Sequence, residues 1–430
     1  MTLRVVHCAG FYFPDPVGGT EVYVRDLAAA LLERGVESSI AASTTDSARD
    51  YLWQGVPVRR YPADVDRAQF QQLVRQLEPD VFHLHSWTTG AGLTHLRHAA
   101  DLGIPCVATL HVPAPLCIRG TMLLEGTRPC DGRIDETRCA YCWALGRGVP
   151  APAAHLISRL PTWTPPPWLT RSPARRLATL ASARTIAANQ AARLQELSQL
   201  CERIVVPSEW VRSALHENAI PDAKILLSRQ AASAAFVGSG RKPRDSAGKR
   251  PLTIGFVGRI ETYKGVRTLI EAMAHIPSQT PLRLVIAGTG DDARNLKAIE
   301  AAAARDPRIE LVGALPHDGI PAFLDSLDIL AVPSRWMETG PIVVLEAQAM
   351  GVPVMGADLG GIAERVRDGI DGWLLPFDNP RAWAAAMQRA ATDPGEVAMR
   401  TANSVRTRSD GDVATEMATL YGEVHERAKK

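Results

Sequence analysis

The sequence contains no long hydrophobic run and almost no excess of one charge. Its apolar stretches all fall short of the roughly 18 to 20 residues that a helix needs to cross a bilayer, so no transmembrane segment is expected. Forty-eight Lys and Arg residues are offset by 46 Asp and Glu residues, which leaves a formal net charge of +2. A general nucleic-acid-binding protein needs a strong positive field, so this balance excludes that class and predicts no nucleic-acid partner.

Cysteine is also scarce, with seven residues in 430. An odd number of cysteines does not fit a framework of disulfides. The N-terminal sequence MTLRVVHCAGFYF has only a short apolar stretch without a small-residue cleavage site, and it does not resemble a signal peptide. Because reduced thiols are typical of the cytosol, the sequence favours a cytoplasmic protein.

What the sequence has in abundance is alternation between short apolar runs and amphipathic helices. Most of the runs are continuous, as expected for parallel strands buried on both faces. The strands expected in the first part of the chain are Leu3–Ala9, Val36–Ala42, Val56–Tyr61, Asp80–His85, Ile104–Leu110, Arg203–Val206 and Lys224–Ser228. Those expected in the second part are Leu252–Val257, Leu282–Ala287, Arg308–Val312, Ile329–Val332, Val352–Met355 and Gly372–Leu375.

This alternation predicts two doubly wound α/β domains of the Rossmann type that face each other across a cleft. The polar segment VGSGRKPRDSAGKRP, rich in Gly and Pro, separates them. We therefore predict an N-terminal domain over residues 1–236, a linker over 237–251, a C-terminal domain over 252–410 and a terminal helix over 411–430.

The strongest motif is SRWMETGPIVVLEAQAMGVPV, residues 334–354. An acid, Glu338, closes the loop after a buried strand, and a second acid, Glu346, follows about one turn into the next helix. Glycine allows close approach of the backbone to a ligand, proline fits the first position of a helix, and the amides of a helix start bind phosphate. The residues predicted to form this phosphate-binding helix start are Gly340, Pro341, Ile342 and Val343.

A second anion-binding element follows the first strand of the same domain. The strand ends at Gly258, and Arg259 and Lys264 lie in the loop after it. Two cations five residues apart are able to neutralise a diphosphate from two directions. Because open α/β sheets bind ligands at the carboxyl ends of their strands, we expect this loop and the helix start to form one site.

Together these motifs resemble those of the retaining glycosyltransferases of family four (group 1), which have the GT-B fold and use nucleotide-sugar donors. The acid-x7-acid spacing of Glu338 and Glu346 carries part of the resemblance. The VGR...KG segment at Val257–Gly265 and the GVPV...GG...E segment at Gly351–Glu364 carry the rest. The resemblance covers nearly the whole chain and is most specific in the second domain.

The resemblance implies a role for each residue of the motifs. Arg259 and Lys264 would hold the donor diphosphate. Glu338 would face the donor sugar, and Glu346 would bind the ribose hydroxyls. His111, which ends the strand IPCVATL, matches the active-site histidine of the family and would hydrogen-bond a hydroxyl of the donor sugar. No metal or cofactor is implied for the catalytic step.

The first domain contributes a glycine loop and two further histidines. Gly18 and Gly19 match the family's glycine loop, where the backbone would approach the donor diphosphate or the acceptor; a simple flexible turn is the alternative. A third spaced glycine is missing, which disfavours a dehydrogenase. His83 and His85 end a neighbouring strand and are interpreted as structural, with His85 the better candidate for a place in the site.

Four cysteines cluster in an insertion over about 113–143 of the first domain. Cys117, Cys130, Cys139 and Cys142 follow the pattern C-x12-C-x8-C-x2-C. Four thiolates suit a structural zinc ion or an iron–sulfur cluster, and the spacing does not separate the two. Reduced or opportunistically paired cysteines are the third interpretation. The insertion follows His111 closely, so we expect it to shape the acceptor pocket.

The segment over about 147–200 is basic and rich in Pro. It holds seven Arg residues against one acid, Glu196. Arg beside exposed Trp and Pro is able to contact an anionic membrane surface, which allows a peripheral position at the inner membrane. A solvated helix face next to a Pro-rich loop is the alternative.

We therefore predict a glycosyltransferase that moves a sugar, with retention, from a nucleotide-diphospho-sugar to a glycan, a lipid-linked glycan or a small molecule. Two alternatives remain open on the residues alone. A sugar-nucleotide 2-epimerase has the same two-domain fold, and a non-catalytic scaffold would bind a nucleotide sugar without turnover.

Overall fold

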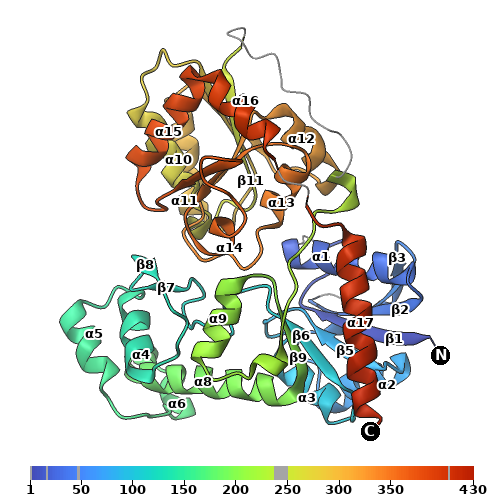
Figure 1. Cartoon of the computed structure of the whole chain (residues 1–430). Helices are drawn as coiled ribbons and strands as arrows, with labels where there is room; N and C mark the ends of the chain where they lie inside the picture. The colour runs from blue at the N-terminus through green and yellow to red at the C-terminus, as the bar shows by residue number, and fades with distance from the viewer. Residues whose placement is uncertain (1, 16–17, 46–48, 237–249, 405–406) are drawn as a thin grey trace. The chain divides into compact units, whose positions relative to one another are not determined.

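The computed structural model describes residues 2–15, 18–45, 49–236, 250–404 and 407–430. The chain divides into two units. One consists of Met1–Arg229 together with Asp410–Lys430, and the other of Gln230–Ser409. Figure 1 shows that helices pack around the sheet of each unit.

The first unit is built on an eight-stranded sheet. Its strands are β1 (Leu3–Ala9), β2 (Val36–Thr44), β3 (Tyr51–Trp53), β4 (Val56–Pro62), β5 (Val81–Leu84), β6 (Cys106–Thr109), β9 (Cys201–Val206) and β10 (Ile225–Leu227). They lie in the order β10-β9-β6-β5-β1-β2-β4-β3, and only β3 runs antiparallel to its neighbour. The chain proceeds outward from β1 on one side and from β5 on the other. The neighbours β1 and β5 therefore form the switch point, where open α/β sheets bind ligands.

The helices of the first unit are α1 (Gly19–Leu32), α2 (Arg67–Leu77), α3 (Leu93–Ala100), α4 (Glu136–Leu145), α5 (Ala151–Ser158), α6 (Pro167–Thr170), α7 (Arg175–Ala181), α8 (Ala183–Leu200), α9 (Glu209–Glu217) and α17 (Asp410–Ala428). Most of them pack around the sheet, whereas α4 and α5 pack on each other and on α8, and α6 and α7 continue this group beside the sheet (Figure 1). A short hairpin of β7 (Leu123–Leu124) and β8 (Arg128–Pro129) precedes α4.

The last helix, α17, packs on the first unit, beside α1 (Figure 1). Its buried stripe of Val413, Met417, Leu420 and Val424 has the spacing of one helix face. On the same helix, Tyr421 is fully buried and its hydroxyl lies 2.6 Å from His83 Nδ1. The terminal helix predicted from residue 411 is thus a structural part of the first unit.

The second unit contains a six-stranded parallel sheet. Its strands are β11 (Leu252–Val257), β12 (Leu282–Ala287), β13 (Ile309–Gly313), β14 (Ile329–Val332), β15 (Val354–Ala357) and β16 (Gly372–Leu375). The order β13-β12-β11-β14-β15-β16 places the switch point between β11 and β14. The helices are α10 (Val266–His275), α11 (Ala293–Ala303), α12 (Ile320–Ser326), α13 (Ile342–Ala349), α14 (Gly360–Ala363), α15 (Pro380–Thr392) and α16 (Pro394–Ala402).

The predicted fold class of two Rossmann-like units is confirmed, with small differences in the boundaries. Residues 237–249 of the predicted linker lie outside the described residues. Residues 230–236, predicted to end the first domain, group with the second unit, where Phe236 is buried and lies 6.3 Å from the ring of His317. Within the basic segment, α7 and α8 follow each other directly and are separated only by Ser182.

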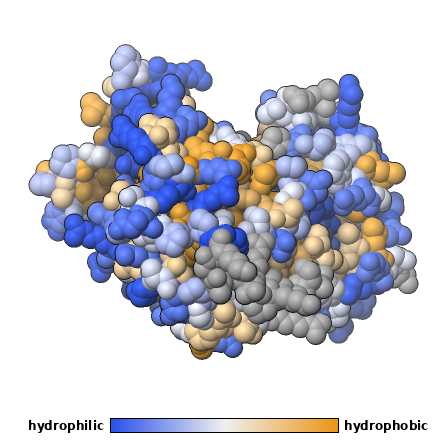
Figure 2. Space-filling model, turned by 90° about the horizontal axis from the view of Figure 1, so that it is seen from above, coloured by the Kyte–Doolittle hydropathy of each residue, from blue (hydrophilic) through white to orange (hydrophobic). Residues whose placement is uncertain are grey.

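Among the described residues, no helix is both long enough and apolar enough to span a membrane. Figure 2 shows a face on which hydrophilic residues predominate and apolar residues form limited patches.

Candidate functional site

The loop after β11 carries the two predicted diphosphate ligands and ends at a glycine that the packing requires. Arg259 is exposed directly after the strand, and Lys264 precedes Gly265. Gly265 has φ +75°, and a Cβ there would lie 1.9 Å from the carbonyl oxygen of Pro333. Only glycine allows this approach. The loop therefore lies directly against the segment that follows β14.

This contact brings the predicted phosphate ligand and the predicted sugar-facing acid together. Lys264 Nζ lies 2.7 Å from Glu338 Oε1, and Ser334 Oγ donates to the same oxygen at 2.8 Å. The ammonium group also lies 5.2 Å from the ring centroid of Trp336. The side chain of Glu338 is only 9% exposed, so water screens the ion pair weakly. A cation and an anion thus share the switch point of the second unit.

The helix start after Glu338 is present, one residue later than predicted. Pro341 is the residue before α13 rather than its first residue, and its carbonyl accepts a hydrogen bond from Val344. The helix begins at Ile342, so the amides of Ile342 and Val343 belong to the first turn, where a helix offers its amides no internal acceptor. Glu346 lies one turn further on and is 4% exposed. These elements favour an anion at the helix start.

Two glycines hold the loop that carries Glu338. The amide of Gly361 donates to the carbonyl of Glu338 at 2.7 Å. A Cβ at Gly361 would lie 2.8 Å from that carbonyl oxygen, and one at Gly360 would lie 2.9 Å from the Cα of Met337. These two glycines of the GVPV...GG...E segment are thus required by packing inside the protein.

In the first unit, the glycine loop begins α1. Gly18 precedes the helix and Gly19 is its first residue. The amide of Gly18 donates to Glu21 Oε2 at 2.9 Å. A Cβ at Gly18 would contact only that carboxylate oxygen among the described residues, at 3.5 Å. Packing within the described chain therefore leaves room for a side chain at this position.

His111 follows β6, near the switch point, and lines a small pocket with His85, Ser86, Thr109 and Pro115. Its Nε2 lies 3.2 Å from His85 Nδ1. Burial lowers the pKa of His111 to about 3, so the ring is neutral at physiological pH. A neutral imidazole is able to donate one hydrogen bond and accept another.

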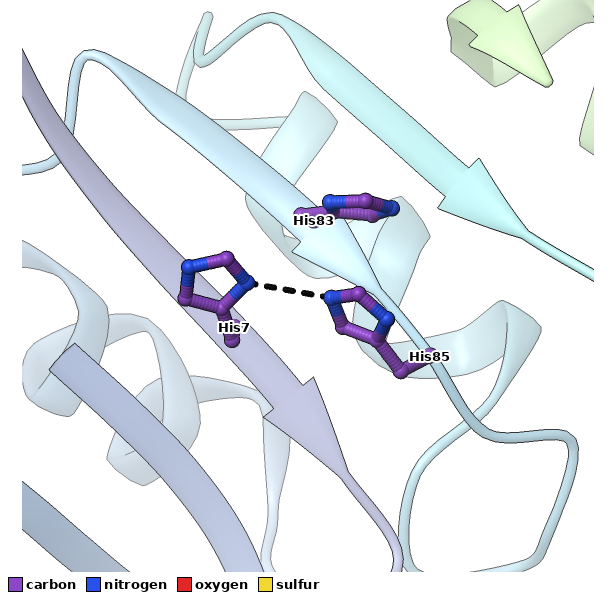
Figure 3. A group of neighbouring side chains, drawn as sticks. All are labelled: His7, His83 and His85. Atoms are coloured by element: carbon purple, nitrogen blue, oxygen red, sulfur yellow. Dashed lines mark hydrogen bonds between the residues drawn. The ribbon is translucent and has the colours of Figure 1, made fainter. Parts of the chain in front are cut away.

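The neighbouring histidines divide into two roles, one of which the sequence reasoning missed. His83 is bonded to Tyr421 and, through Nε2, to Thr109 Oγ1 at 2.7 Å, which makes it structural as predicted. His85 contacts His111, and on its other side it contacts His7 on β1 (Figure 3). His7 was not singled out because it interrupts the apolar run VVHCA as a lone polar residue.

The predicted cysteine set is only loosely assembled. Within the described chain, the one group of three or more metal-ligating side chains whose donor atoms all lie within 4.8 Å of one another is His7, His83 and His85. The cysteines do not form such a group. Burial raises the pKa of Cys139 to about 11, and the neighbouring thiols of Cys117 and Cys130 contribute.

Cationic groups stand beside these sulfurs. Arg119 Nη1 donates to Cys142 Sγ at 3.4 Å, and the amide of Glu125 donates to the same sulfur at 3.1 Å. Arg138 acts electrostatically on the thiols of Cys130 and Cys139 and lowers their pKa against the larger effect of burial. The insertion therefore provides positive charge near three of the four sulfur atoms, those of Cys130, Cys139 and Cys142.

The basic segment exposes large apolar side chains. Leu156, Trp168 and Leu177 are 69%, 71% and 71% exposed. Leu160 and Trp163 are also exposed. Five of the eleven large apolar side chains that are exposed in the described chain thus fall within about twenty residues. Exposed Arg residues are interspersed with them, namely Arg159, Arg171, Arg175 and Arg176.

Comparison with known families divides the chain as the structure does. Residues 17–227 match the model of Glycosyltransferase Family 4, and residues 241–408 match that of the group 1 glycosyl transferases. The D-inositol 3-phosphate glycosyltransferase of Pseudarthrobacter chlorophenolicus is 26% identical over 94% of this chain and 89% of its own. The alpha-D-kanosaminyltransferase of Streptomyces kanamyceticus is 32% identical over 34% of this chain and 37% of its own.

Solved structures are similar over the whole length. Sucrose-phosphate synthase from Thermosynechococcus elongatus has a TM-score of 0.67 at 17% identity, covering 99% of this chain and all of its own. Anabaena HepE, in complex with UDP and glucose, has a TM-score of 0.63 at 16% identity over the full length of both chains. At these identities the likeness concerns the fold, which is that of the GT-B glycosyltransferases. The chain belongs to the group 1 glycosyltransferases of family four.

Proposed function

We propose that the protein transfers a sugar from a nucleotide-diphospho-sugar to a hydroxyl of a glycan, a lipid-linked glycan or a small molecule, with retention of the anomeric configuration. The observation that carries this proposal is the Lys264–Glu338 pair, 2.7 Å apart at the switch point beside the start of α13. In this pair, Lys264 supplies positive charge for a diphosphate, and Glu338 supplies an acid next to that charge. The UDP bound to Anabaena HepE, a protein of similar fold, supports a nucleotide donor.

In this proposal the charges of the second unit stabilise the leaving group. Negative charge grows on the diphosphate as the bond to the sugar breaks, and Arg259, Lys264 and the amides of Ile342 and Val343 would bind it. Gly340 and Pro341 shape that helix start. Because these groups are fixed before the reaction, no divalent cation is required for the step.

The remaining candidates would orient the donor. Glu338 would face the sugar, and Glu346 would accept hydrogen bonds from the ribose hydroxyls. From the first unit, His111 would hydrogen-bond a sugar hydroxyl, and the backbone at Gly18 and Gly19 would approach the diphosphate or the acceptor.

We expect one nucleotide sugar to stand out in a thermal-shift panel of uridine and guanosine donors. A ligand that binds only the folded state stabilises it by about 2.7 kcal/mol at a hundredfold excess over Kd. With an acceptor present, NMR of the product is expected to show the anomeric configuration of the donor. An inverted product would contradict retention. A new nucleotide sugar formed without any acceptor would indicate an epimerase instead.

We further propose that the four cysteines bind a structural zinc ion, with an iron–sulfur cluster as the alternative outcome of the same test. A zinc ion with four thiolates has a net charge of −2, which Arg119 and Arg138 would offset. Binding would draw the sulfurs of Cys117, Cys130, Cys139 and Cys142 together. The metal would hold the hairpin and α4 in place and take no part in the transfer.

We also propose that this enzyme works in the cytoplasm and contacts an anionic inner-membrane surface through the exposed residues of the basic segment. The proposal is supported by apolar side chains, Trp168 and Leu177 among them, that stand between Arg residues. Apolar burial and attraction to anionic headgroups add to each other in interfacial binding.

The expected result is co-sedimentation with phosphatidylglycerol–phosphatidylcholine vesicles but not with phosphatidylcholine alone, weakened by salt. Trp168→Ser combined with Leu177→Ser is expected to lower binding about tenfold or more, because two large apolar side chains no longer enter the interface. Leu52→Ser is the matched control, since Leu52 is 70% exposed on β3 of the same unit. The membrane contact would be contradicted if Leu52→Ser lowered vesicle binding as much as the double variant does, or if the wild type did not bind anionic vesicles.

A further inference from the structure

A row of three imidazoles runs through the interior of the first unit and ends at His111. Ser38 Oγ lies 3.3 Å from His7 Nε2, and His7 Nδ1 lies 3.0 Å from His85 Nε2. His85 Nδ1 lies 3.2 Å from His111 Nε2. Figure 3 shows the central link between β1 and β5, at the switch point of the sheet. Side chains from β1, from β2 and from the segments that follow β5 and β6 thus form one continuous chain of hydrogen bonds.

The row lies in the core and its rings are neutral. His7 and His85 are 0% and 1% exposed. Burial lowers the pKa of His7 to about 3 and that of His85 well below its ordinary value, with neighbouring imidazoles contributing to the shift at His85. Each ring therefore carries one N–H and one bare nitrogen.

Proton counting along the row leaves two arrangements in which every contact is made. In one, Ser38 donates to His7, His7 Nδ1–H donates to His85, and His85 Nδ1–H donates to His111 Nε2. In the other, every donor and acceptor is reversed, and His111 Nε2–H donates to His85. The proton on His111 is then on Nδ1 in the first arrangement and on Nε2 in the second. The tautomer of His111 is therefore coupled to His85, His7 and Ser38.

We infer that His85, supported by His7 and Ser38, is a positioning residue that sets the tautomer and the ring orientation of His111. This inference rests on the proposed function, in which His111 hydrogen-bonds a donor-sugar hydroxyl. A sugar hydroxyl is able both to donate and to accept a hydrogen bond. The tautomer of His111 therefore decides whether the hydroxyl donates to the ring or accepts from it. A ring fixed in one tautomer binds the sugar hydroxyl without first moving a proton between its nitrogens. Such preorganisation favours a faster reaction as well as a defined geometry.

The same donor atoms do not form a good metal centre. His83 is the third member of the group within 4.8 Å. Both of its nitrogens are already used, by Tyr421 at 2.6 Å and by Thr109 at 2.7 Å. His83 therefore anchors α17 to the sheet, while His7 and His85 belong to the row. This division gives the experiment its control.

Two substitutions of His85 cut the row on opposite sides. In His85→Asn, the side-chain amide takes the place of Nδ1 of the ring. The hydrogen bond to His111 is therefore kept and the one to His7 is lost. In His85→Gln, the side-chain amide takes the place of Nε2 of the ring. The hydrogen bond to His7 is therefore kept and the one to His111 is lost. Because loss of a positioning partner costs about 10- to 100-fold in activity, we expect kcat to fall by that factor in His85→Gln. We expect it to stay within about threefold of wild type in His85→Asn, with a similar donor KM in both.

The second readout is the tautomer itself, measured by ¹H–¹⁵N correlation NMR of the imidazole nitrogens of His111. Wild type and His85→Asn should each show a single tautomer, and His85→Gln a mixture. His83→Gln, which removes a buried imidazole outside the row, should lower the melting temperature without changing the tautomer or kcat. An unchanged tautomer in His85→Gln, or an equal fall of kcat in both Gln variants, would overturn the inference.

The NMR readout also separates this inference from the proposed function. If His111→Ala leaves turnover intact while His85→Gln still changes the tautomer, the row exists as described and the sugar-binding role of His111 is wrong. If the tautomer of His111 is the same in His85→Gln as in the wild type, the row does not determine that tautomer, whichever reaction the enzyme catalyses. Where His85→Gln folds poorly, Ser38→Ala tests the far end of the row by the same NMR measurement, and an unchanged tautomer in Ser38→Ala counts against the coupling.

Discussion

Lys264→Ala is expected to lower kcat/KM for sugar transfer by about 10²- to 10³-fold, the usual cost of removing one preorganised group that stabilises charge in a transition state. The lysine would bind the diphosphate, whose negative charge grows as the glycosidic bond breaks. Both kcat and donor affinity should therefore fall, with the larger effect on kcat. Steady-state kinetics with donor titration by calorimetry separates the two.

The matched control for this variant is Arg267→Ala, which removes an exposed cation from α10 a few residues away. Arg267 lies 3.5 Å from Glu271 in a surface ion pair, and its loss should leave turnover within about twofold of wild type. Lys264→Ala also leaves the buried carboxylate of Glu338 without its cation. Lys264→Ala combined with Glu338→Gln shows how much of the loss comes from that unpaired charge. Wild-type kinetics in Lys264→Ala would mean that the donor diphosphate binds elsewhere.

Replacing Cys139 and Cys142 together by Ser is expected to remove bound metal completely and to lower the melting temperature by about 5 to 10 °C. A structural metal contributes its binding energy to folding, so its loss is a loss of stability. Mass spectrometry under native conditions should find one zinc ion per chain, and visible absorption would reveal an iron–sulfur cluster instead. A chelator should lower the melting temperature of the wild type in the same way.

Cys106→Ala is the control for this pair, because Cys106 lies in β6 and is buried outside the insertion. It should change stability through packing and leave the metal content unchanged. Protein that is still folded after chelation should keep its turnover without added magnesium. If the purified wild type contains no metal, and if the variant with Ser at both Cys139 and Cys142 melts at the same temperature as the wild type, the cysteines are ordinary reduced thiols.

The sheets could be predicted from the sequence because their strands are continuous apolar runs. β1, β11, β12, β14 and β16 begin and end at the predicted residues. The strands that were missed, β3 and the hairpin of β7 and β8, have two or three residues each, too few for any periodicity. The return of α17 to the first unit depends on long-range packing, which local sequence patterns do not contain.

The charged part of the candidate site could also be predicted, since Lys264 and Glu338 follow strands that a doubly wound sheet places side by side. Their supporting residues could not. Ser334 and Trp336 are common residue types whose function depends on where the loop folds back. His7 was missed for a related reason: a single histidine inside a buried strand acquires a role only through its neighbours on β2 and β5.

The division of the first unit into two separate stretches of sequence has a consequence for biosynthesis. The ribosome completes residues 1–229 first, but the helix that covers their sheet comes from residues 410–428. Residues 230–409 are made in between, which takes roughly 10 to 40 s at ordinary translation rates. During that interval the sheet lacks α17, and His83 lacks the hydroxyl of Tyr421. The second unit is continuous in sequence and needs no residue made after it, whereas the first unit is complete only when α17 has been made, at the very end of synthesis.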